Sequence, residues 1–392
     1  MRRLQLSRAS LLLIALLLLA GCGAPQAGRG PSPRPSASRR PTPSARPTPA
    51  PTPTPTPDLA AGMSLPQKIA QLEMVGFPGA GLTAEEAQQF QLYRFGSIVV
   101  YPGDENGSTP QQVSALIAGV RQAEGAGPGV LVSTNQEGGT VCYTASGVYC
   151  AAGAHELGAE GTAAVTAGYS QMAQGLKQLG IQTGLAPDAD VWDGDPAQSL
   201  ADRSFGTDPA HVAQDVTAAV QADHGAGVMA VAKHFPGEGS AGDTETYLPT
   251  DSETMQQLQS VNFPPFQAAI ASGVDMIMVG HVLMSAINPT LPASLAPQTY
   301  QILRTQLGYQ GVLISDDLGM GAITPRYDQA QAGLMALEAG ADIIMFASSI
   351  NAAVQAIPLI EQAVRSGRLP MARLDASVTR VLELKQRYGL EA

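Results

Sequence analysis

Short runs rich in apolar residues recur eight times along the chain after residue 73. Between them, Val, Leu and Ile fall at three- and four-residue intervals, as in residues 110–123 and 208–223, and this spacing predicts helices. Residues 374–389 predict another helix, with Asp375 as its N-cap and Gly389 as its stop. The eight runs are residues 74–79, 95–102, 129–138, 183–191, 228–237, 275–282, 311–320 and 341–347.

Near-continuous apolar strands that alternate with helices are typical of a parallel sheet covered on both faces. Eight such units within about 330 residues predict an α/β fold, a closed (β/α)8 TIM barrel that forms a single domain. A doubly wound open sheet is the alternative. Its nucleotide-binding version is weakened because no GxGxxG or GxxxxGKS motif follows the first run.

The first 21 residues have the three parts of a bacterial lipoprotein signal peptide. Three arginines precede the apolar run 11–20, which is too short to span a bilayer comfortably. A pair of small residues stands immediately before Cys22, as in a lipobox. We expect Cys22 to become the acylated first residue and to anchor the protein outside the cytoplasm on the cell membrane. An ordinary cleaved signal with an incidental cysteine is the alternative.

Residues 22–57 are dominated by Pro, Ser, Thr, Ala and Arg and contain no acidic residue. Such a composition cannot bury a core, and it predicts an extended, polyproline-like tether. At about 3.1 Å per residue its reach is roughly 100 Å. The tether would therefore hold a folded domain, residues 58–392, at a distance from the membrane.

The charge of the chain divides at the same boundary. Eight arginines precede the first acidic residue, Asp58, so 22 − 8 leaves 14 basic residues against 33 acidic ones, a formal charge of −19. A domain this acidic is a poor partner for nucleic acid or for anionic lipid. We expect no nucleic-acid partner and a monomeric protein.

Two cysteines remain beyond the tether, Cys142 and Cys150, on two short arms around Ala145, Ser146 and Gly147. In an exported protein this arrangement predicts a disulfide, with two free buried thiols as the alternative. No CxxC or HExxH motif accompanies them, so we expect no metal site.

Polar side chains stand mostly at the ends of the apolar runs. In a TIM barrel the active site lies at the carboxyl ends of the strands, so these groups should converge on one rim. One such cluster could be a capped helix start, but five of them predict a functional cleft. They are Asn135, Gln136 and Glu137; Asp188, Asp190 and Asp193; Lys233 and His234; His281; and Asp316 and Asp317.

Carboxylates with one lysine and two histidines, without metal-ligand spacing, suit a neutral polyhydroxylated substrate and require no cofactor. Hydrolysis of a glycoside needs two carboxyl groups across the scissile bond. Asp316 ends a strand and would be held rigidly, as a nucleophile must be. The glycine-rich loop after the fifth run offers Glu238, Asp243 or Glu245 as the proton donor.

Five motifs in this order make the chain resemble glycoside hydrolase family 3, and within it the single-domain, NagZ-like β-N-acetylhexosaminidases. The likeness extends from Leu65 to Leu390 and leaves no segment for a second α/β domain. The motifs are NQEGG (135–139), DRSFG (202–206), KHFPGEG (233–239), GHV with PTLPASL (280–295) and LGYQGVLISDDLGM (307–320).

The resemblance implies a retaining mechanism with a covalent glycosyl intermediate on Asp316. It also implies that Arg203, Lys233 and His234 contact the hydroxyl groups of the sugar in the −1 subsite. Asn135 and His281 are further candidates for substrate binding, since each falls in a matching motif.

The chain departs from the family pattern at the acid/base residue. The family uses a histidine of an Asp-Ser-His triplet, and this triplet aligns with Asp243-Thr244-Glu245 here. Glu245 is therefore the candidate acid/base and Asp243 its possible partner. A carboxyl group can fill this role if burial and a neighbouring charge raise its pKa.

The motif that binds the sugar departs as well, because the family's DQEGGRVQR reads NQEGGTVCY. Asn135 replaces an acid, and Thr140 and Tyr143 replace two arginines. An asparagine can bond a hydroxyl group but lacks the charge-assisted bond of a carboxylate.

From the resemblance we expect an exported, lipid-anchored β-N-acetylhexosaminidase that acts on amino-sugar glycans, wall-derived as in peptidoglycan turnover, or environmental. A sugar-binding pseudo-enzyme of the same fold and a β-glucosidase or β-xylosidase are the alternatives. Whether water or phosphate accepts the sugar stays open at this point.

Overall fold

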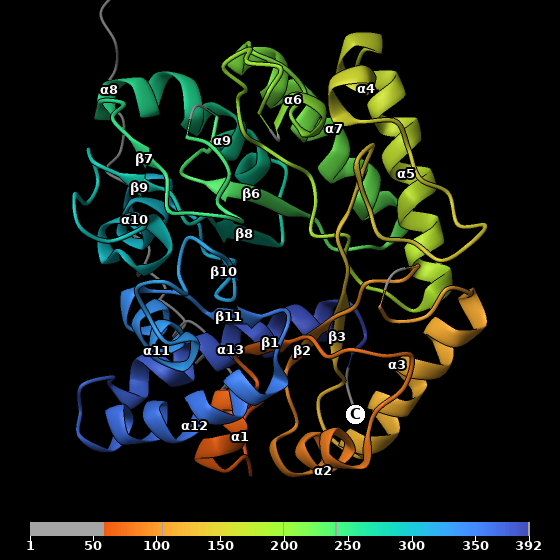
Figure 1. The fold of residues 1–392 in the computed structure, drawn as a ribbon, viewed down its shortest axis with the longest axis vertical. Helices are drawn as coiled ribbons and strands as arrows, with labels where there is room; N and C mark the ends of the chain where they lie inside the picture. Colours follow the sequence, from red (N-terminus) through yellow and green to blue (C-terminus); the bar gives the residue numbers. More distant parts are fainter. Residues whose placement is uncertain (1–58, 104, 199, 240, 391–392) are drawn as a thin grey trace, which may run out of the picture. The chain divides into compact units, whose positions relative to one another are not determined.

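Seven of the eight predicted runs form parallel strands of one curled sheet (Figure 1). The strands follow the order β3-β2-β1-β11-β10-β8-β6, and nearly every residue in them is buried, as strands covered on both faces require. Their bounds are β1 Glu73–Val75, β2 Ser97–Val99, β3 Leu131–Ser133, β6 Val231–Phe235, β8 Met276–Val279, β10 Val312–Asp317 and β11 Ile343–Phe346.

This computed structural model describes residues 59–103, 105–198, 200–239 and 241–390. The predicted signal peptide, the tether and the anchor Cys22 lie outside the described residues. Within the described ranges, no helix is long and apolar enough to cross a membrane.

The fourth predicted run, residues 183–191, closes the barrel without forming a continuous strand. Thr183 bridges Ser133 of β3 on one side and Met229, just before β6, on the other. Pro187 has no N–H to donate to a ladder, and Leu185 has a left-handed φ of 46°. The (β/α)8 barrel is confirmed, but the prediction of a full fourth strand is wrong because these two residues interrupt it.

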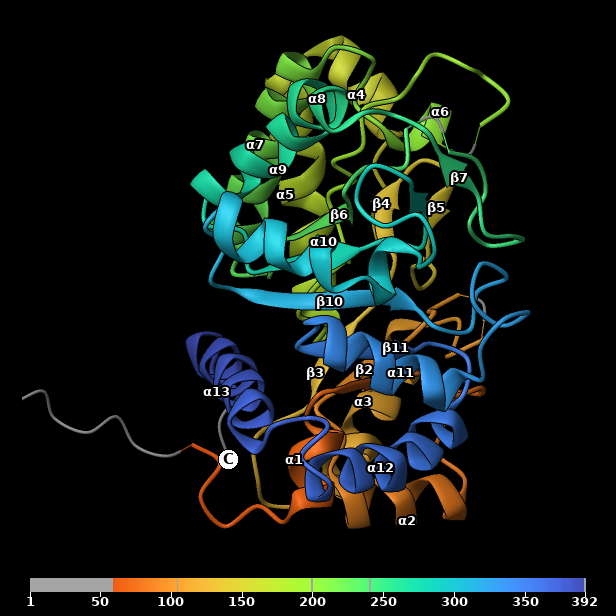
Figure 2. The same cartoon turned by 90° about the vertical axis from the view of Figure 1, so that its left-hand side faces the viewer.

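Helices surround the sheet (Figures 1 and 2). Both helices predicted from periodicity are confirmed: Thr109 caps the one that begins with Pro110, and Asp208 caps the one that begins with Pro209. The longer helices are α1 Leu65–Ala70, α2 Ala84–Tyr93, α3 Pro110–Glu124, α4 Ala154–Glu160, α5 Thr162–Leu179, α7 Pro209–Ala226, α9 Phe263–Ala271, α11 Gln329–Ala339, α12 Ile350–Arg365 and α13 Met371–Arg387.

Shorter elements lie between the strands and helices of the barrel. Two small sheets pair β4 Gln136–Gly138 with β5 Val141–Cys142, and β7 Thr250–Asp251 with β9 Leu283–Met284. The short helices are α6 Leu200–Arg203, α8 Met255–Gln257, η1 Leu258–Asn262, η2 Ala293–Leu295, α10 Pro297–Gln301 and η3 Ile302–Gln306.

The two ends of the described chain meet on one side of the barrel, where α1 packs against α12 and α13 (Figures 1 and 2). The prediction that Asp375 caps the last helix is wrong. The helix begins four residues earlier, at Met371, and Asp375 lies inside it, where its carboxylate pairs with Lys68 at 2.7 Å.

A buried carboxylate fastens α13 to the sheet. Asp342, directly before β11, is fully buried and accepts hydrogen bonds from Arg304 and Arg380 at 2.5 and 3.0 Å. It also accepts one from the backbone N–H of Leu313 in β10 at 3.0 Å and one from Ser377 of α13. One side chain thus joins two strands to two outer elements.

Asp342→Asn should lower the free energy of unfolding by about 3 kcal/mol, because it leaves the partly buried Arg304 and Arg380 without their counter-charge and removes a fully buried carboxylate from its hydrogen bonds. Urea denaturation followed by circular dichroism would measure the change. Asp375→Asn is the matched control: its pair with Lys68 is partly exposed, so the loss should stay below about 1 kcal/mol. Equal losses in the two variants would show that Asp342 has no special role.

Candidate active site

A cleft of about 330 Å³ opens at the carboxyl ends of the strands, as the barrel predicts. The structure brings most of the predicted site residues together around it. Those that line the cleft are Asn135, Arg203, Lys233, His234, Asp243, Glu245 and Asp316. His281 is not among the lining residues.

A buried carboxylate fixes two cations at the floor of this cleft. Glu137 of β4 accepts hydrogen bonds from Arg203 Nε at 2.7 Å and Nη2 at 3.0 Å, and its Oε1 lies 2.5 Å from Lys233 Nζ. Burial alone would raise the pKa of Glu137, but the two cations hold it well below its usual range. Glu137 is therefore ionised, and it sets the orientation of both basic side chains.

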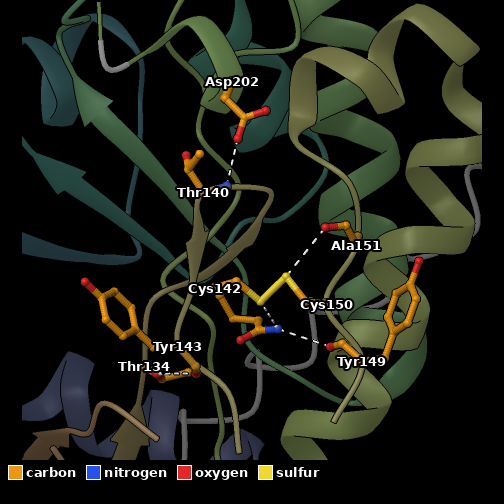
Figure 3. Close-up of a disulfide and its surroundings, with 9 residues drawn as sticks. Thr134, Thr140, Cys142, Tyr143, Tyr149, Cys150, Ala151 and Asp202 are labelled. Carbon is orange, nitrogen blue, oxygen red and sulfur yellow. Dashed lines mark hydrogen bonds between the residues drawn. A yellow bond between two sulfur atoms is a disulfide. The ribbon is translucent and has the colours of Figure 1, made fainter. Parts of the chain in front are cut away.

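The arginine reaches the floor because α6 is tied to the β4–β5 turn. Asp202, the residue before Arg203, accepts a hydrogen bond from the backbone N–H of Thr140 at 2.7 Å (Figure 3). Gly139 is required beside it, since a Cβ there would lie 2.2 Å from the Asp202 carboxylate.

His234 carries a positive charge at neutral pH. Its Nδ1 lies 2.8 Å from Asp190 Oδ2, and its Nε2 lies 3.4 Å from Arg203 Nη2. Burial lowers the pKa of His234, but the charges of Glu238 and Asp190 and the hydrogen bond to Asp190 raise it to about 9. Asp190 also accepts the backbone N–H of Glu238 at 2.8 Å, so it positions both residues.

Asp316, near the end of β10, is a buried but ionised carboxylate. Burial raises its pKa, and the charge of His234 together with the N–H of Asp317, which donates to Oδ1 at 2.8 Å, brings the pKa below its usual value. Asp317 in turn accepts the N–H groups of Gly319 and Ala347 at 3.0 and 2.8 Å. These bonds hold the end of β10 against β11.

His281 lies behind the cleft wall and not in the cleft, so its predicted place at the rim needs correction. It is fully buried; its Nε2 donates to the carbonyl of Asp317 at 2.8 Å, and its Nδ1 accepts from Ser294 at 2.7 Å. Burial lowers the pKa of His281, so the ring is neutral. It supports the backbone beside Asp316.

The loop that carries the candidate acid/base is bonded to the segment after β10. The carbonyl of Glu245 accepts the N–H of Gly321 at 2.9 Å, and that of Thr244 accepts the N–H of Ala322 at 3.1 Å. Asp243 accepts the N–H of Glu245 at 3.0 Å. Partial burial, with the charges of Asp316 and Asp243, raises the pKa of Glu245.

Glu238 is a second carboxyl group with a raised pKa in the same cleft. It is 7% exposed, its Oε1 has no hydrogen-bond partner among the residues that the structure describes, and burial raises its pKa to about 7. Gly280 makes room for it, because a Cβ there would lie 2.6 Å from Oε1. Glu238 is one of the three proton donors that the sequence offered, and it lines the same cleft as Asp243 and Glu245.

Sequence reasoning gave no role to the aromatic side of the cleft. Tyr101, Glu105 and Tyr143 all line it, and the two tyrosine rings meet edge to face at 5.0 Å. Tyr101 lies at the end of the second predicted run, residues 95–102, so the rule that selected the charged residues would also have selected it.

Cys142 and Cys150 are joined by a disulfide that closes the loop after β5 (Figure 3). Gln136 of β4 lies against it, with Nε2 3.2 Å from Cys142 Sγ, and donates to the carbonyl of Tyr149 at 3.2 Å. The loop is therefore held to the strand that follows Asn135.

One group of side chains within the described ranges has the spacing of a metal site: Asp188, Asp190 and His234. A cation already lies beside it, since Arg203 Nη2 is 3.7 Å from Asp188. The pKa of His234, raised to about 9, also means that a proton competes with a metal for its ring at neutral pH. We assign this group to the ionic network of the floor.

An α/β barrel with carboxyl groups of lowered and raised pKa around one cleft is the arrangement of a glycoside hydrolase. The comparison with known families agrees, since the glycosyl hydrolase family 3 N-terminal domain matches residues 64–384. The chain belongs to this family, and the predicted resemblance is confirmed.

Relatives refine this assignment. The chain is 34% identical over 281 residues to a β-hexosaminidase of Xanthomonas oryzae pv. oryzae, covering 69% of this chain and 82% of that one. It is 32% identical to the β-hexosaminidase LpqI of Mycobacterium tuberculosis, covering 83% and 84%. The protein is thus a glycoside hydrolase of hexosaminidase type.

A solved structure shows the same fold in a longer protein. A family 3 β-N-acetylglucosaminidase from Paenibacillus superposes with a TM-score of 0.80 and 35% identity over 84% of this chain. The chain spans 64% of that protein's length, under two thirds of it.

Glu238→Gln should lower the pKa of His234 from about 9, because the charge of Glu238 is the strongest influence that raises it. NMR titration of the histidine ring would measure the shift. Asp243→Asn is the control, since Asp243 is not among the groups that set the His234 pKa. An unchanged titration in Glu238→Gln would mean that the two side chains are not electrostatically linked.

Proposed function

We propose that this protein is an exported, lipid-anchored, retaining β-N-acetylhexosaminidase. It removes terminal N-acetylglucosamine from wall-derived or environmental glycans through a covalent intermediate on Asp316, with water as the acceptor. The printed names of the relatives, hexosaminidases and an N-acetylglucosaminidase, support the choice of sugar. The anchor at Cys22 is supported by the signal-peptide pattern.

The observation that carries the mechanism is the opposite shift of two carboxyl pKa values in one cleft. Asp316 is ionised, and the pKa of Glu245 is raised, so the two suit the roles of nucleophile and acid. Asp316 attacks the anomeric carbon while Glu245 gives its proton to the leaving oxygen. Glu245, now ionised, then takes a proton from water, whose oxygen attacks the anomeric carbon and frees Asp316.

The floor supplies the contacts for the sugar. Arg203, Lys233 and His234 are held by Glu137 and Asp190, so their remaining N–H groups are fixed before substrate arrives. Donors fixed in this way lose little entropy when they bind hydroxyl groups.

The acidic wall of the cleft favours water over phosphate as the acceptor. Asp243 and Asp317 line it together with Asp316, and the charges of these carboxylates would repel a phosphate anion. A sugar-binding pseudo-enzyme remains the competing function, since the family's histidine is absent. The raised pKa of Glu245 favours the enzyme, because it keeps a transferable proton in the cleft.

Asp316→Asn should reduce kcat/KM for aryl β-N-acetylglucosaminide by roughly three orders of magnitude, because the covalent route is lost. Steady-state assays on the β-N-acetylglucosaminide, β-glucoside and β-xyloside would measure it. Glu383→Gln, an exposed change on α13, should leave the rate unaltered. If no substrate turns over faster in the wild type than in Asp316→Asn, the protein is not a glycosidase that uses Asp316.

Glu245→Gln should slow glycosides with poor leaving groups far more than activated aryl glycosides, which need little protonation. In the wild type, kcat/KM should fall on the acid side as Asp316 gains a proton, at a pH below the usual aspartate range because its pKa is lowered. It should also fall on the alkaline side as Glu245 loses its proton, at a pH above the usual glutamate range because its pKa is raised. Glu245→Gln should abolish the alkaline limb.

The pH profile also shows whether Glu245 or Glu238 supplies the proton to the leaving group. If the alkaline limb lies near pH 7 and survives Glu245→Gln but disappears in Glu238→Gln, then Glu238 supplies the proton. Equal losses on poor and activated leaving groups in Glu245→Gln would likewise argue against Glu245.

A further inference from the structure

The cleft has a buried polar floor and a more exposed aromatic rim. Lys233, His234 and Asp316 are at most 8% exposed, whereas Tyr101 and Tyr143 are half-buried and Glu105 is exposed. A terminal sugar that reaches the floor leaves the next sugar of the glycan at the rim. The rim residues therefore face the leaving group of the proposed reaction.

The half of the rim that carries Tyr101 is built around a buried asparagine. Asn106 is 1% exposed; its Oδ1 accepts the N–H of Tyr101 at 2.8 Å, and its Nδ2 donates to the carbonyls of Phe77 and Gly79, each at 2.9 Å. All polar atoms of its side chain are thus used to shape this loop. Tyr101 is positioned before any substrate binds.

The half of the rim that carries Tyr143 is fixed from both sides. Its N–H donates to the carbonyl of Asn135 at 3.0 Å, and its carbonyl accepts from Thr134 Oγ1 at 3.3 Å. The disulfide begins at the preceding residue, and Figure 3 shows the Tyr143 ring pointing away from it. A bond from Ser146 N–H to the carbonyl of Ser108, 2.9 Å long, joins the two loops.

The chemistry of the rim suits an uncharged sugar. Two tyrosines offer apolar ring faces and hydroxyl groups, a combination that fits the mixed surface of a pyranose. Glu105 adds a carboxylate at the rim, and Asp317 lines the same cleft. A sugar with its own carboxylate would meet like charges there.

No compensating cation lines the rim in the part of the chain that the structure describes. The basic side chains of the cleft are Arg203, Lys233 and His234, all at the floor. Each already pairs with a carboxylate, Glu137 for the first two and Asp190 for the third. A carboxylate on the leaving sugar would therefore be repelled by the acidic side chains of the rim, and no unpaired cation among the described residues there would offset this repulsion.

We propose that Tyr101, Glu105 and Tyr143 form a leaving-group subsite that accepts an uncharged amino sugar and disfavours one that carries a carboxylate, such as the lactyl ether of muramic acid. This inference rests on the proposed function and narrows it. The preferred glycans are neutral β-linked N-acetylglucosamine oligomers, and intact muramic-acid linkages are poor substrates.

Three disaccharides with N-acetylglucosamine at the cleaved end test the subsite. Their second sugar is N-acetylglucosamine, N-acetylmuramic acid or the methyl ester of N-acetylmuramic acid. At low salt, kcat/KM for the neutral disaccharide should exceed that for the acid by about tenfold or more, and the ester should recover most of the loss. An acid cleaved as fast as its ester would overturn the inference.

Two variants of rim residues test which side chains make the enzyme cleave the ester faster than the acid. Glu105→Gln and Tyr143→Arg should each narrow the ratio between the ester and the acid, the second more strongly because it adds a cation. Glu160→Gln, an exposed change on α4 away from the cleft, should leave the ratio as in the wild type. If the ratio of kcat/KM between the ester and the acid is unchanged in both rim variants, Glu105 and Tyr143 do not belong to the subsite.

Two further measurements separate this inference from the proposed function. If the wild type has no activity on aryl β-N-acetylglucosaminide, the proposed function is wrong. Calorimetric binding of the same disaccharides to Asp316→Asn tests the subsite without turnover, and equal dissociation constants for the acid and its ester would overturn it. If the wild type cleaves the aryl glycoside but cleaves the three disaccharides equally well, the proposed subsite is wrong and the proposed function stands.

Discussion

The bonds from Arg203 and Lys233 to the buried carboxylate of Glu137 are the constraint on which the cleft depends. They join α6 and β6 to β4, three elements that are far apart in the sequence. Removing charges from water is costly, and the cost is offset only where each charge has a partner at short range. Two cations share this carboxylate, so Glu137 alone neutralises only one of the two charges. The ionised Asp316 depends on the neighbouring His234, whose charge lowers its pKa.

Much of the fold and part of the site could be predicted from the sequence. Buried parallel strands have a strong apolar pattern, and the rule that barrel sites lie at strand ends led to Asn135, Lys233, His234 and Asp316. The same rule failed for His281, because it places a residue at a strand end but does not say which way the side chain points. Ser294, from a distant short helix, turns this ring into the wall. Such a contact has no signature in local sequence.

The remaining differences have similar causes. The fourth run looks apolar enough for a strand, but the effect of Pro187 and Leu185 on the ladder depends on their position in the closed barrel. Asp375 has the residue type of an N-cap, yet the helix starts earlier and the carboxylate pairs with Lys68 of α1. The sequence pointed to charged groups for chemistry, so it gave no weight to Tyr101, whose contribution is the shape and apolar surface of the rim.

In the proposed mechanism Glu245 takes the place of the family's histidine, and this changes how the proton is held. A histidine near acidic side chains tends to stay protonated, whereas a carboxyl group holds a proton at mild pH only if its surroundings oppose ionisation. Here the opposing charges are Asp316 and Asp243, and the bonds from Gly321 and Ala322 keep the loop near β10. In our proposal, the acidic side chains that keep the proton on Glu245 also disfavour an anionic leaving sugar. One distribution of charge thus supports both the proposed proton donor and the proposed preference for a neutral leaving sugar.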